Sequence, residues 1–335
     1  MTLYVRDIGL MKVTVVIADS CSSAGVATAL EAFESANILH QAKTQKKARI
    51  FDVETASLDG KPVQSQGGLA LAPEKKLSEV DRTDLILVPG FLFKVLSLLP
   101  NLTGILPWLS KHYAQKATIA SMCTGSFLIA EAGLLDAKLA TTHWYFASEF
   151  KRRYPSVKLS EQHTVTEDQG IICSGGATAA NDMLLHLIRK FVSNELASEC
   201  SKKMLVDTGR TNQTPYIMQS FRRNHEDLNV KRVQVWLDDN FMSMIAFEDV
   251  AKDFGFGARN FTRRFKTATE MTPTEYLQNL RIEKAKYLLE TTKHSVSKIT
   301  YEVGYQDTSS FSKLFKDRVN ISPCDYRKKF HLPTK

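Results

Sequence analysis

Apolar residues in the last hundred positions follow a helical period, and the same pattern occurs twice. In the first copy they fall three and four positions apart, the spacing of one buried helix face: Phe247, Val250, Ala251 and Phe254. Gly255 is expected to end this helix, and a second helix to begin near Ala258. The second helix would bury a further apolar set: Phe261, Phe265 and Ala268. This pattern predicts a helix-turn-helix.

The second copy repeats the first in the same register. Phe311 and Phe315 follow Phe261 and Phe265 at a constant offset of 50 positions. Ser295 and Asp307 are placed to cap two helices, with Gly304 at the turn between them and three apolar residues in the first helix: Val296, Ile299 and Val303. The chain therefore predicts two helix-turn-helix motifs.

A long helix is predicted to join the two motifs. It runs from Pro273 to about Thr291 and opens with a capping box formed by Thr272 and Glu275. At 1.5 Å per residue its length is about 28 Å, and successive major-groove faces of DNA lie about 34 Å apart. A rod of this length would hold two recognition helices on one face of a DNA duplex.

The first two hundred residues alternate between strand and helix patterns. Buried strands are predicted at these ranges: 13–18, 50–55, 85–88 and 117–121. The helix from Ala24 to Leu39 is expected to bury one face: Val26, Leu30, Phe33 and Ile38. This order is typical of an α/β doubly wound parallel sheet with helices on both faces. We predict an α/β domain over 11–205, a linker over 206–229 and an all-α domain of two helix-turn-helix motifs over 230–335.

Charge, cysteine content and the apolar runs each add to this picture. Residues 230–335 contain 19 lysines and arginines against 13 aspartates and glutamates, so most of the chain's net charge of +8 lies with the helix-turn-helix pair. A basic module is suited to DNA phosphates. The five cysteines are widely spaced, with no metal-binding or disulfide pattern, so we expect a reducing cytoplasm, no metal and no cofactor. The most apolar run, 85–99, is interrupted by Pro89, Gly90 and Lys94, so no membrane segment is expected.

The outward faces of the two recognition helices carry the candidate DNA contacts. Polar and basic residues there are predicted to contact bases in the major groove: Arg259, Thr262 and Arg263 in the first motif, and Thr308, Ser309, Ser312 and Lys313 in the second. Further basic residues are predicted to contact phosphate: Lys266, Lys316, Arg327 and Lys328. The alternative is an exposed helical face without a role in base contact.

The region Val230 to Phe330 resembles the DNA-binding domain of the AraC family of transcription regulators. The two glycine turns, the aromatic pairs, the RRFK and KLFK runs and the closing SPCDYRKKF all stand where that family has them. One departure is Ala246, at an N-cap position where the family usually carries Ser or Thr. Glu248 and Asp249 in the first turn partly compensate through the helix dipole.

Ligands of open α/β sheets bind beyond the carboxyl ends of the strands, so the residues there are the candidate pocket. These residues are Ser20, Cys21, Gly90, Phe91, Cys123, Thr124, His143 and Trp144. The SMCTGSF segment is a strand, a cysteine and a helix start, which predicts a nucleophile elbow at Cys123. Together with AEAGLLDAKLATTHW it resembles the PfpI-like amidase family over Met11 to Leu205. PfpI-like domains placed ahead of an AraC-type domain form a known group of regulators, the GlxA-like group, which this chain resembles in both halves.

The elbow permits two interpretations. In an enzyme, Cys123 would be the nucleophile, His143 its partner, and the backbone N–H groups near Gly90 and Cys123 an oxyanion site. Active PfpI-like proteins place a Glu after the first strand, whereas this chain has the run Asp19 to Ala24, in which Asp19 comes early in register. Without that carboxylate, we expect a binding pocket and no catalysis. A buried structural Cys and His with no pocket is the further alternative.

The sequence thus predicts a cytoplasmic transcription regulator that binds double-stranded promoter DNA and senses a small metabolite. The family resemblance implies a homodimer and an effector such as an amino acid or a quaternary amine. The main competing function is an amidase-like hydrolase with a DNA-binding appendage. A constitutive DNA-organising protein is a third possibility, and it would show little sequence preference.

Overall fold

The structure is a computed structural model that describes residues 9–219 and 221–331. The chain divides into two compact units after Gln213, inside the segment 206–229 predicted as a linker. The first unit has one hydrophobic core and the second unit has two. Within the described residues, no helix is both long enough and apolar enough to cross a membrane.

The first unit is built on a seven-stranded sheet with the order β10-β11-β7-β6-β1-β2-β5. Neighbouring strands are parallel except for the pair β10 and β11, which is antiparallel at one edge. The strands of this sheet are β1 Met11–Val16, β2 Phe51–Ser57, β5 Lys75–Lys76, β6 Leu85–Val88, β7 Thr118–Ser121, β10 Val165–Asp168 and β11 Ile171–Ser174. Two small pairs lie outside it: β3 Val63–Gln64 with β4 Ala70–Leu71, and β8 Leu139–Ala140 with β9 Lys158–Leu159. The predicted doubly wound sheet is confirmed.

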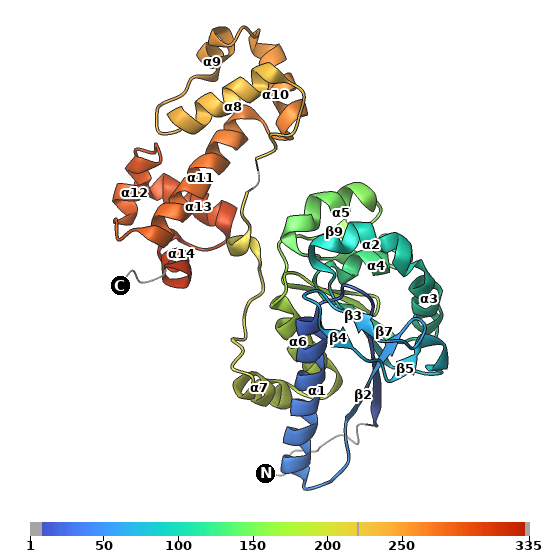
Figure 1. Ribbon diagram of the computed structural model, residues 1–335. Helices are drawn as coiled ribbons and strands as arrows, with labels where there is room; N and C mark the ends of the chain where they lie inside the picture. The colour runs from blue at the N-terminus through green and yellow to red at the C-terminus, as the bar shows by residue number, and fades with distance from the viewer. Residues whose placement is uncertain (1–8, 220, 332–335) are drawn as a thin grey trace. The chain divides into compact units, whose positions relative to one another are not determined.

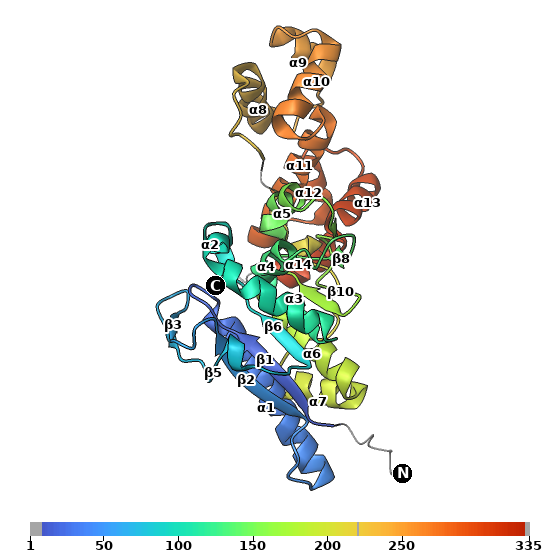
Figure 2. The same cartoon turned by 90° about the vertical axis from the view of Figure 1, so that its right-hand side faces the viewer.

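Helices cover both faces of this sheet (Figures 1 and 2). One layer contains α1 Ser23–Thr44, α6 Ala179–Phe191 and α7 Asn194–Lys203, which pack against one another. The other contains α2 Val95–Leu102, α3 Leu106–Ala114, α4 Ser126–Glu131 and α5 Ala147–Arg153. The central strand β6 is buried along its whole length and β1 is buried from Val13 to Val16, because both faces of the sheet are covered.

The buried face of α1 differs from the prediction. Val26 and Phe33 are buried as expected, but Ile38 is 45% exposed. The neighbouring Asn37 is fully buried instead, and its amide donates to the Phe51 carbonyl and accepts from the N–H groups of Ile50 and Phe51. These bonds anchor α1 to the start of β2, so a polar residue takes the inward position.

The second unit consists of seven helices within the described residues. They are α8 Leu228–Asn240, α9 Phe247–Asp253, α10 Ala258–Thr269, α11 Pro273–Thr291, α12 Val296–Glu302, α13 Thr308–Val319 and α14 Pro323–Phe330. The capping box at Thr272 and the side-chain caps at Ser295 and Asp307 form as the sequence indicates, and Ser322 caps α14 in the same way. The N-cap residue of α9 is Ala246, which forms no side-chain cap, also as expected.

The helix α11 runs through the middle of this unit and contributes to two separate cores (Figure 1). Its first half packs Tyr276, Leu277 and Leu280 against the first motif, and its second half packs Ile282, Ala285 and Leu289 against the second. The paired aromatics of both motifs are fully buried: Phe261, Phe265, Phe311 and Phe315. Each copy of the repeated sequence pattern therefore forms its own hydrophobic core, and both cores share α11.

The segment before α8 packs on the helices of the second unit. Ile217 accepts a hydrogen bond from the buried ammonium of Lys286 on α11, and Phe221 contacts the Tyr276 ring at 4.7 Å between centroids. Tyr216 lies edge-on to Phe330 of α14. Much of the predicted linker is therefore part of the helical unit.

Candidate functional site

The predicted elbow is present at the end of β7. Cys123 has the left-handed φ of 55° that a nucleophile elbow requires, and a short 3-10 helix, Cys123–Gly125, leads into α4. Gly125 is essential to this turn, because a Cβ there would lie 2.6 Å from the Val88 carbonyl oxygen. The Thr124 hydroxyl accepts from the Phe91 N–H at 2.8 Å and ties the end of β6 to the elbow.

The environment of Cys123 opposes nucleophilic chemistry. The residue is 3% exposed, and burial raises the pKa of its thiol to about 11. Burial also lowers the pKa of His143, so this imidazole is neutral at pH 7. No hydrogen bond joins Cys123 to His143 within the described residues, and the Nδ1 atom of His143 accepts from the Tyr145 N–H. The geometry therefore lacks an activated thiolate.

A cavity of about 150 Å³ lies beside the elbow. Its lining comes from the start of α1, the ends of β6 and β7 and the start of α6: Ser22, Ala24, Gly25, Thr28, Gly90, Met122, Cys123, Ala177, Thr178, Ala180 and Asn181. Two residues of the predicted pocket, Gly90 and Cys123, belong to this lining. The cavity therefore lies at the edge of the sheet where ligands of open α/β sheets are expected to bind.

The other six predicted pocket residues lie elsewhere. Cys21, Phe91 and Thr124 are fully buried and pack into the domain, so their side chains do not line the cavity. Ser20 has a φ of 62° and its N–H donates to the Gln64 carbonyl. His143 and Trp144 are half-buried, and neither lines the cavity. Hydropathy reveals that a residue follows a strand but does not reveal how deeply its side chain is buried.

Other residues line the cavity instead, and the sequence pattern indicates them less strongly. Ser22 is the N-cap of α1, where its hydroxyl accepts from the Gly25 N–H, and it follows β1 closely. Thr178 and Asn181 follow the Gly175-Gly176 pair that precedes α6. Asp19, the carboxylate nearest the expected Glu position, accepts from the Gln64 N–H at 2.9 Å. None of the residues that line the cavity is a carboxylate.

We expect Cys123 to resist alkylation at neutral pH. A thiol with a pKa near 11 is almost fully protonated at pH 7, and only the thiolate attacks iodoacetamide. The exposed Cys324 serves as an internal control in the same sample. Mass spectrometry of native protein should show modified Cys324 before modified Cys123 at pH 7, with the Cys123 rate rising as the pH approaches 11. Rapid modification of Cys123 at pH 7 would contradict the buried-thiol assignment.

The recognition helices α10 and α13 place the predicted DNA contacts at the surface. In α10, Arg259, Thr262 and Arg263 are exposed, as is Lys266 one turn later. In α13, Ser309, Lys313 and Lys316 are exposed, while Thr308 and Ser312 are half-buried. The aromatic residues on the opposite faces are buried, so each helix has one side available to a partner.

Two neighbouring arginines of α10 have different environments. The Arg263 guanidinium donates to Asn260 at 3.0 Å and stays exposed, with further donors available. Arg264 instead forms two 2.8 Å hydrogen bonds with Asp227 and lies over the Phe256 ring, so it fixes the start of α8 to α10. This structural role of Arg264 has no sequence signal beyond its inward phase on the helix.

The phosphate assignment of Arg327 needs correction. Arg327 is half-buried, and its guanidinium donates to the His294 carbonyl, so it holds α14 to the connection after α11. Lys328 is exposed and lies 3.7 Å from Asp325, an open surface pair. Of the two, only Lys328 is free enough to reach a phosphate group.

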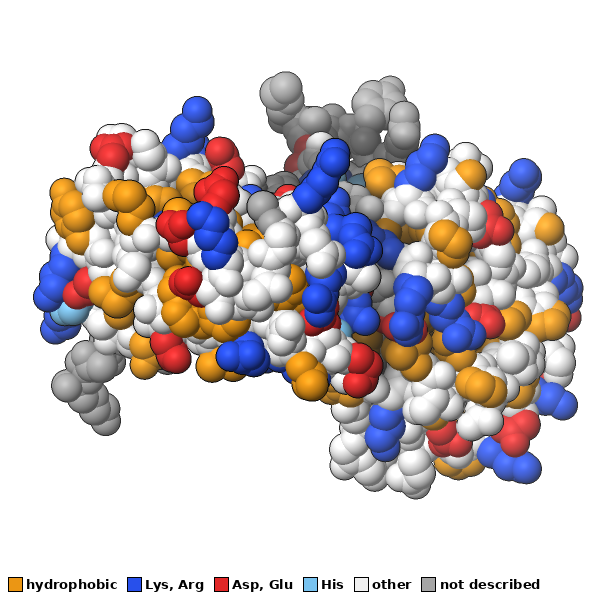
Figure 3. Space-filling view, turned by 90° about the horizontal axis from the view of Figure 1, so that it is seen from above, with side chains coloured by type: hydrophobic (Ala, Val, Ile, Leu, Met, Phe, Trp, Pro, Cys, Tyr) orange, Lys and Arg blue, Asp and Glu red, His pale blue; other side chains and the backbone are white. Residues whose placement is uncertain are grey.

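Charged side chains of both signs are interspersed on the surface. Figure 3 shows lysine and arginine side chains projecting from both units, with acidic side chains between them. Charge of one sign does not dominate the face shown. Recognition of a DNA base sequence would therefore depend on particular side chains. No group of three or more metal-ligating side chains lies close enough to hold a metal ion within the described parts of the chain.

Comparison with known proteins identifies both units. Residues 11–190 match the model of the DJ-1/PfpI family, and residues 250–329 match that of a helix-turn-helix domain. The chain belongs to the DJ-1/PfpI family. Its organisation is a DJ-1/PfpI domain followed by an AraC-type helix-turn-helix domain, which confirms the resemblance found in the motifs.

Curated relatives align with this chain over different shares of their length. The HTH-type transcriptional regulator CdhR of Pseudomonas aeruginosa is 28% identical over 90% of this chain and 87% of its own. The HTH-type transcriptional regulator GbdR of the same species is 25% identical over 92% of this chain and 82% of its own. The HTH-type transcriptional activator RhaS of Salmonella paratyphi B is 38% identical over 103 residues, 31% of this chain and 37% of its own.

Solved structures support the fold of the DJ-1/PfpI domain. An AraC family transcriptional regulator from Pseudomonas putida aligns with 58% of this chain and 99% of its own, with a TM-score of 0.50 and 22% identity. A THiJ/PfpI family protein from Pseudomonas syringae aligns with 70% of this chain and 89% of its own, with a TM-score of 0.52 and 18% identity. Identities this low concern the fold alone.

Proposed function

We propose that this protein is a transcription regulator that binds specific double-stranded DNA and senses a small metabolite through its DJ-1/PfpI domain. One observation carries the proposal: two recognition helices with exposed polar faces are fixed to the two ends of one continuous helix. That helix, α11, has 19 residues and a length of about 28 Å. The curated relatives that align with about nine-tenths of the chain are named as transcription regulators.

The proposed DNA contacts come from α10 and α13. Arg259, Thr262 and Arg263 would contact bases in one major groove, and Thr308, Ser309, Ser312 and Lys313 would do so in the next. Lys266, Lys316 and Lys328 would contact phosphates. Their exposure and their separation from the buried aromatic faces support these roles.

The proposed effector site is the cavity beside the elbow. A cavity of about 150 Å³ has the volume that holds a molecule of benzene's size, so a compact metabolite would fit. Ser22, Thr178 and Asn181 offer hydroxyl and amide groups, and Cys123 offers a neutral thiol. A small amino acid or quaternary amine remains the class we propose. The raised pKa of Cys123 supports a binding role over an amidase role.

Two further properties belong to the proposal. Recognition of direct-repeat sites would use a homodimer, which the family resemblance implies. A regulator must also reach chromosomal DNA, so we propose a cytoplasmic location, in agreement with five cysteines that form no disulfide.

DNA selection followed by affinity measurement tests this function. Full-length protein is incubated with sheared genomic DNA, and the retained fragment is compared with a scrambled duplex of equal length and base composition at about 0.15 M salt. We expect the retained sequence to bind at least about 1,000-fold more tightly than the scrambled one, as specific readers do. Repetition with pooled amino acids and quaternary amines should change the affinity for the retained sequence. Equal affinity for both duplexes under all conditions would reject the regulator in favour of a DNA-organising protein.

A further inference from the structure

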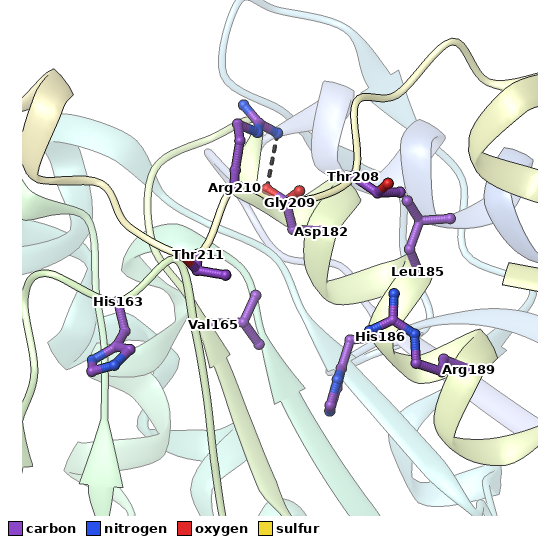
Figure 4. A pocket seen from close by; sticks show the side chains of 10 residues that line it. All are labelled: His163, Val165, Asp182, Leu185, His186, Arg189, Thr208, Gly209, Arg210 and Thr211. Carbon is purple, nitrogen blue, oxygen red and sulfur yellow. Dashed lines mark ion pairs between the residues drawn. The ribbon is translucent and has the colours of Figure 1, made fainter. Parts of the chain in front are cut away.

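A second, larger cavity lies in the first unit, away from the elbow. Its volume is about 490 Å³, within the range typical of small-molecule sites. It opens to the surface, and its lining comes from α6, the start of β10 with the residues just before it, and the segment 208–211 (Figure 4): His163, Val165, Asp182, Leu185, His186, Arg189, Thr208, Gly209, Arg210 and Thr211. No residue lines both this cavity and the cavity beside the elbow. We refer to it as the α6 cavity.

The helix α6 presents one continuous stripe to the α6 cavity. The residues of the stripe are spaced three and four apart, so they share one face of the helix: Asp182, Leu185, His186 and Arg189. The opposite face of α6 is apolar and packs into the core, with Met183, Leu184 and Leu187 buried. This stripe is therefore directed toward the cavity by the packing of the rest of the helix.

Charges around the α6 cavity leave one cation unpaired. Asp182 forms an ion pair with Arg210 at 2.9 Å, and Glu167 contacts both Lys190 and His186. The side chain of Arg189 has no hydrogen bond and no ion pair within the described residues. Its guanidinium can thus present all its donors to a ligand without breaking an existing contact.

We propose that the α6 cavity binds a small organic anion whose carboxylate or phosphate group pairs with Arg189. A planar guanidinium binds either group through two parallel hydrogen bonds. The hydroxyls of Thr208 and Thr211 supply further polar contacts, and Val165 with Leu185 gives a short hydrocarbon chain an apolar surface. Each neighbouring carboxylate already has a cationic partner, so an incoming anion meets a net positive surface.

One wall of the α6 cavity is the chain that leads to the second unit. Arg210 donates to the side chain and carbonyl of Thr178 at 3.0 and 2.9 Å, and the Gln213 amide donates to the carbonyls of Thr142 and Glu161. The division between the units follows directly after Gln213. An anion held between Arg189 and this wall stabilises the docked segment. An effect of the bound anion on the affinity for DNA would additionally rest on the proposed function.

Calorimetric titration of the full-length protein tests the site without DNA. Succinate is the carboxylate probe and inorganic phosphate the phosphate probe, each at constant ionic strength with chloride as the reference. We expect one of the two anions to bind, and Arg189→Ala to weaken that binding by at least about tenfold, the usual size of a charged hydrogen-bond loss. Arg189→Lys should retain part of the affinity. Arg152→Ala, at an exposed arginine of α5 outside both cavities, is the matched control and should leave binding unchanged.

Two results would contradict the proposed anion site and its coupling to the segment 206–213. If neither anion binds more tightly than chloride, or if Arg189→Ala binds like the natural protein, the site is rejected. Hydrogen exchange of a peptide covering 206–213 should slow when the bound anion is present. If the anion binds through Arg189 but this exchange is unchanged, the coupling to the segment is rejected. None of these measurements involves DNA. A failed DNA-binding experiment would therefore reject the proposed function without rejecting the anion site.

Discussion

Replacing Gly304 with alanine is expected to destabilise the second helix-turn-helix motif by about 3 kcal/mol or more, well beyond the effect of the same change at Gly255. Both glycines have a left-handed φ, +82° at Gly304 and +73° at Gly255, which costs an alanine about 1–2 kcal/mol. At Gly304 the new Cβ would also lie 2.6 Å from the Met242 carbonyl oxygen, whereas at Gly255 it meets nothing within 4 Å. Relief of that overlap requires a backbone shift, worth about 1–3 kcal/mol more.

The duplicated motifs provide the control for this experiment. Alanine lowers the entropy of the unfolded chain equally at both positions, so that contribution cancels in the comparison. Hydrogen exchange, followed peptide by peptide, should show faster exchange of α12 and α13 in Gly304→Ala than of α9 and α10 in Gly255→Ala. Equal protection losses in the two motifs would mean that the contact with Met242 does not constrain the second turn.

The contact at Gly304 is part of a junction between the motifs. Arg281, near the middle of α11, donates to the carbonyls of Phe241 and Ser243 at 2.8 and 2.9 Å and lies over the Tyr305 ring. The connection that follows α8 is thereby held against the turn of the second motif. The two motifs are consequently coupled through backbone contacts as well as through the shared helix, which restricts the spacing between their recognition helices.

The features that the sequence could predict depend on residues that lie close together in the chain. The caps at Thr272, Ser295 and Asp307 and the aromatic pairs depend on residues close together in the chain, and helix bounds such as Pro273–Thr291 followed directly from them. The parallel strands were visible because strands covered on both faces form continuous apolar runs. In these regions each local preference agrees with the tertiary structure.

The sequence could not predict how deeply a side chain is buried or which residues far away in the chain it contacts. Phe91 and Cys21 follow strands, yet both are fully buried, because the side on which a side chain packs depends on helices far away in the chain. Arg327 was predicted to contact phosphate as part of a basic run, but its guanidinium donates to the His294 carbonyl. The contact of Arg264 with Asp227 joins two residues that lie far apart in the chain. The α6 cavity required the segment 208–211 to fold back over α6, which no periodicity indicates.

Replacing Arg263 with alanine is expected to cost about 1–3 kcal/mol on the preferred DNA sequence and to relax the preference at one base pair. Arg263 is exposed on α10, where Asn260 steadies its guanidinium and leaves donors for a base edge. Lys316→Ala should weaken the preferred and scrambled duplexes alike and reduce the salt dependence by about one counterion, because a lysine on phosphate carries no sequence information.

The two variants are best measured together, by titration of both duplexes over a range of salt concentrations. Lys293→Ala is the matched control, since Lys293 is an exposed lysine of the same unit that lies outside both recognition helices. Base contact predicts that Arg263→Ala lowers the ratio of specific to non-specific affinity, while Lys316→Ala leaves that ratio unchanged. If Arg263→Ala weakens the two duplexes equally, its guanidinium binds phosphate, and base readout by α10 must then come from Arg259 and Thr262.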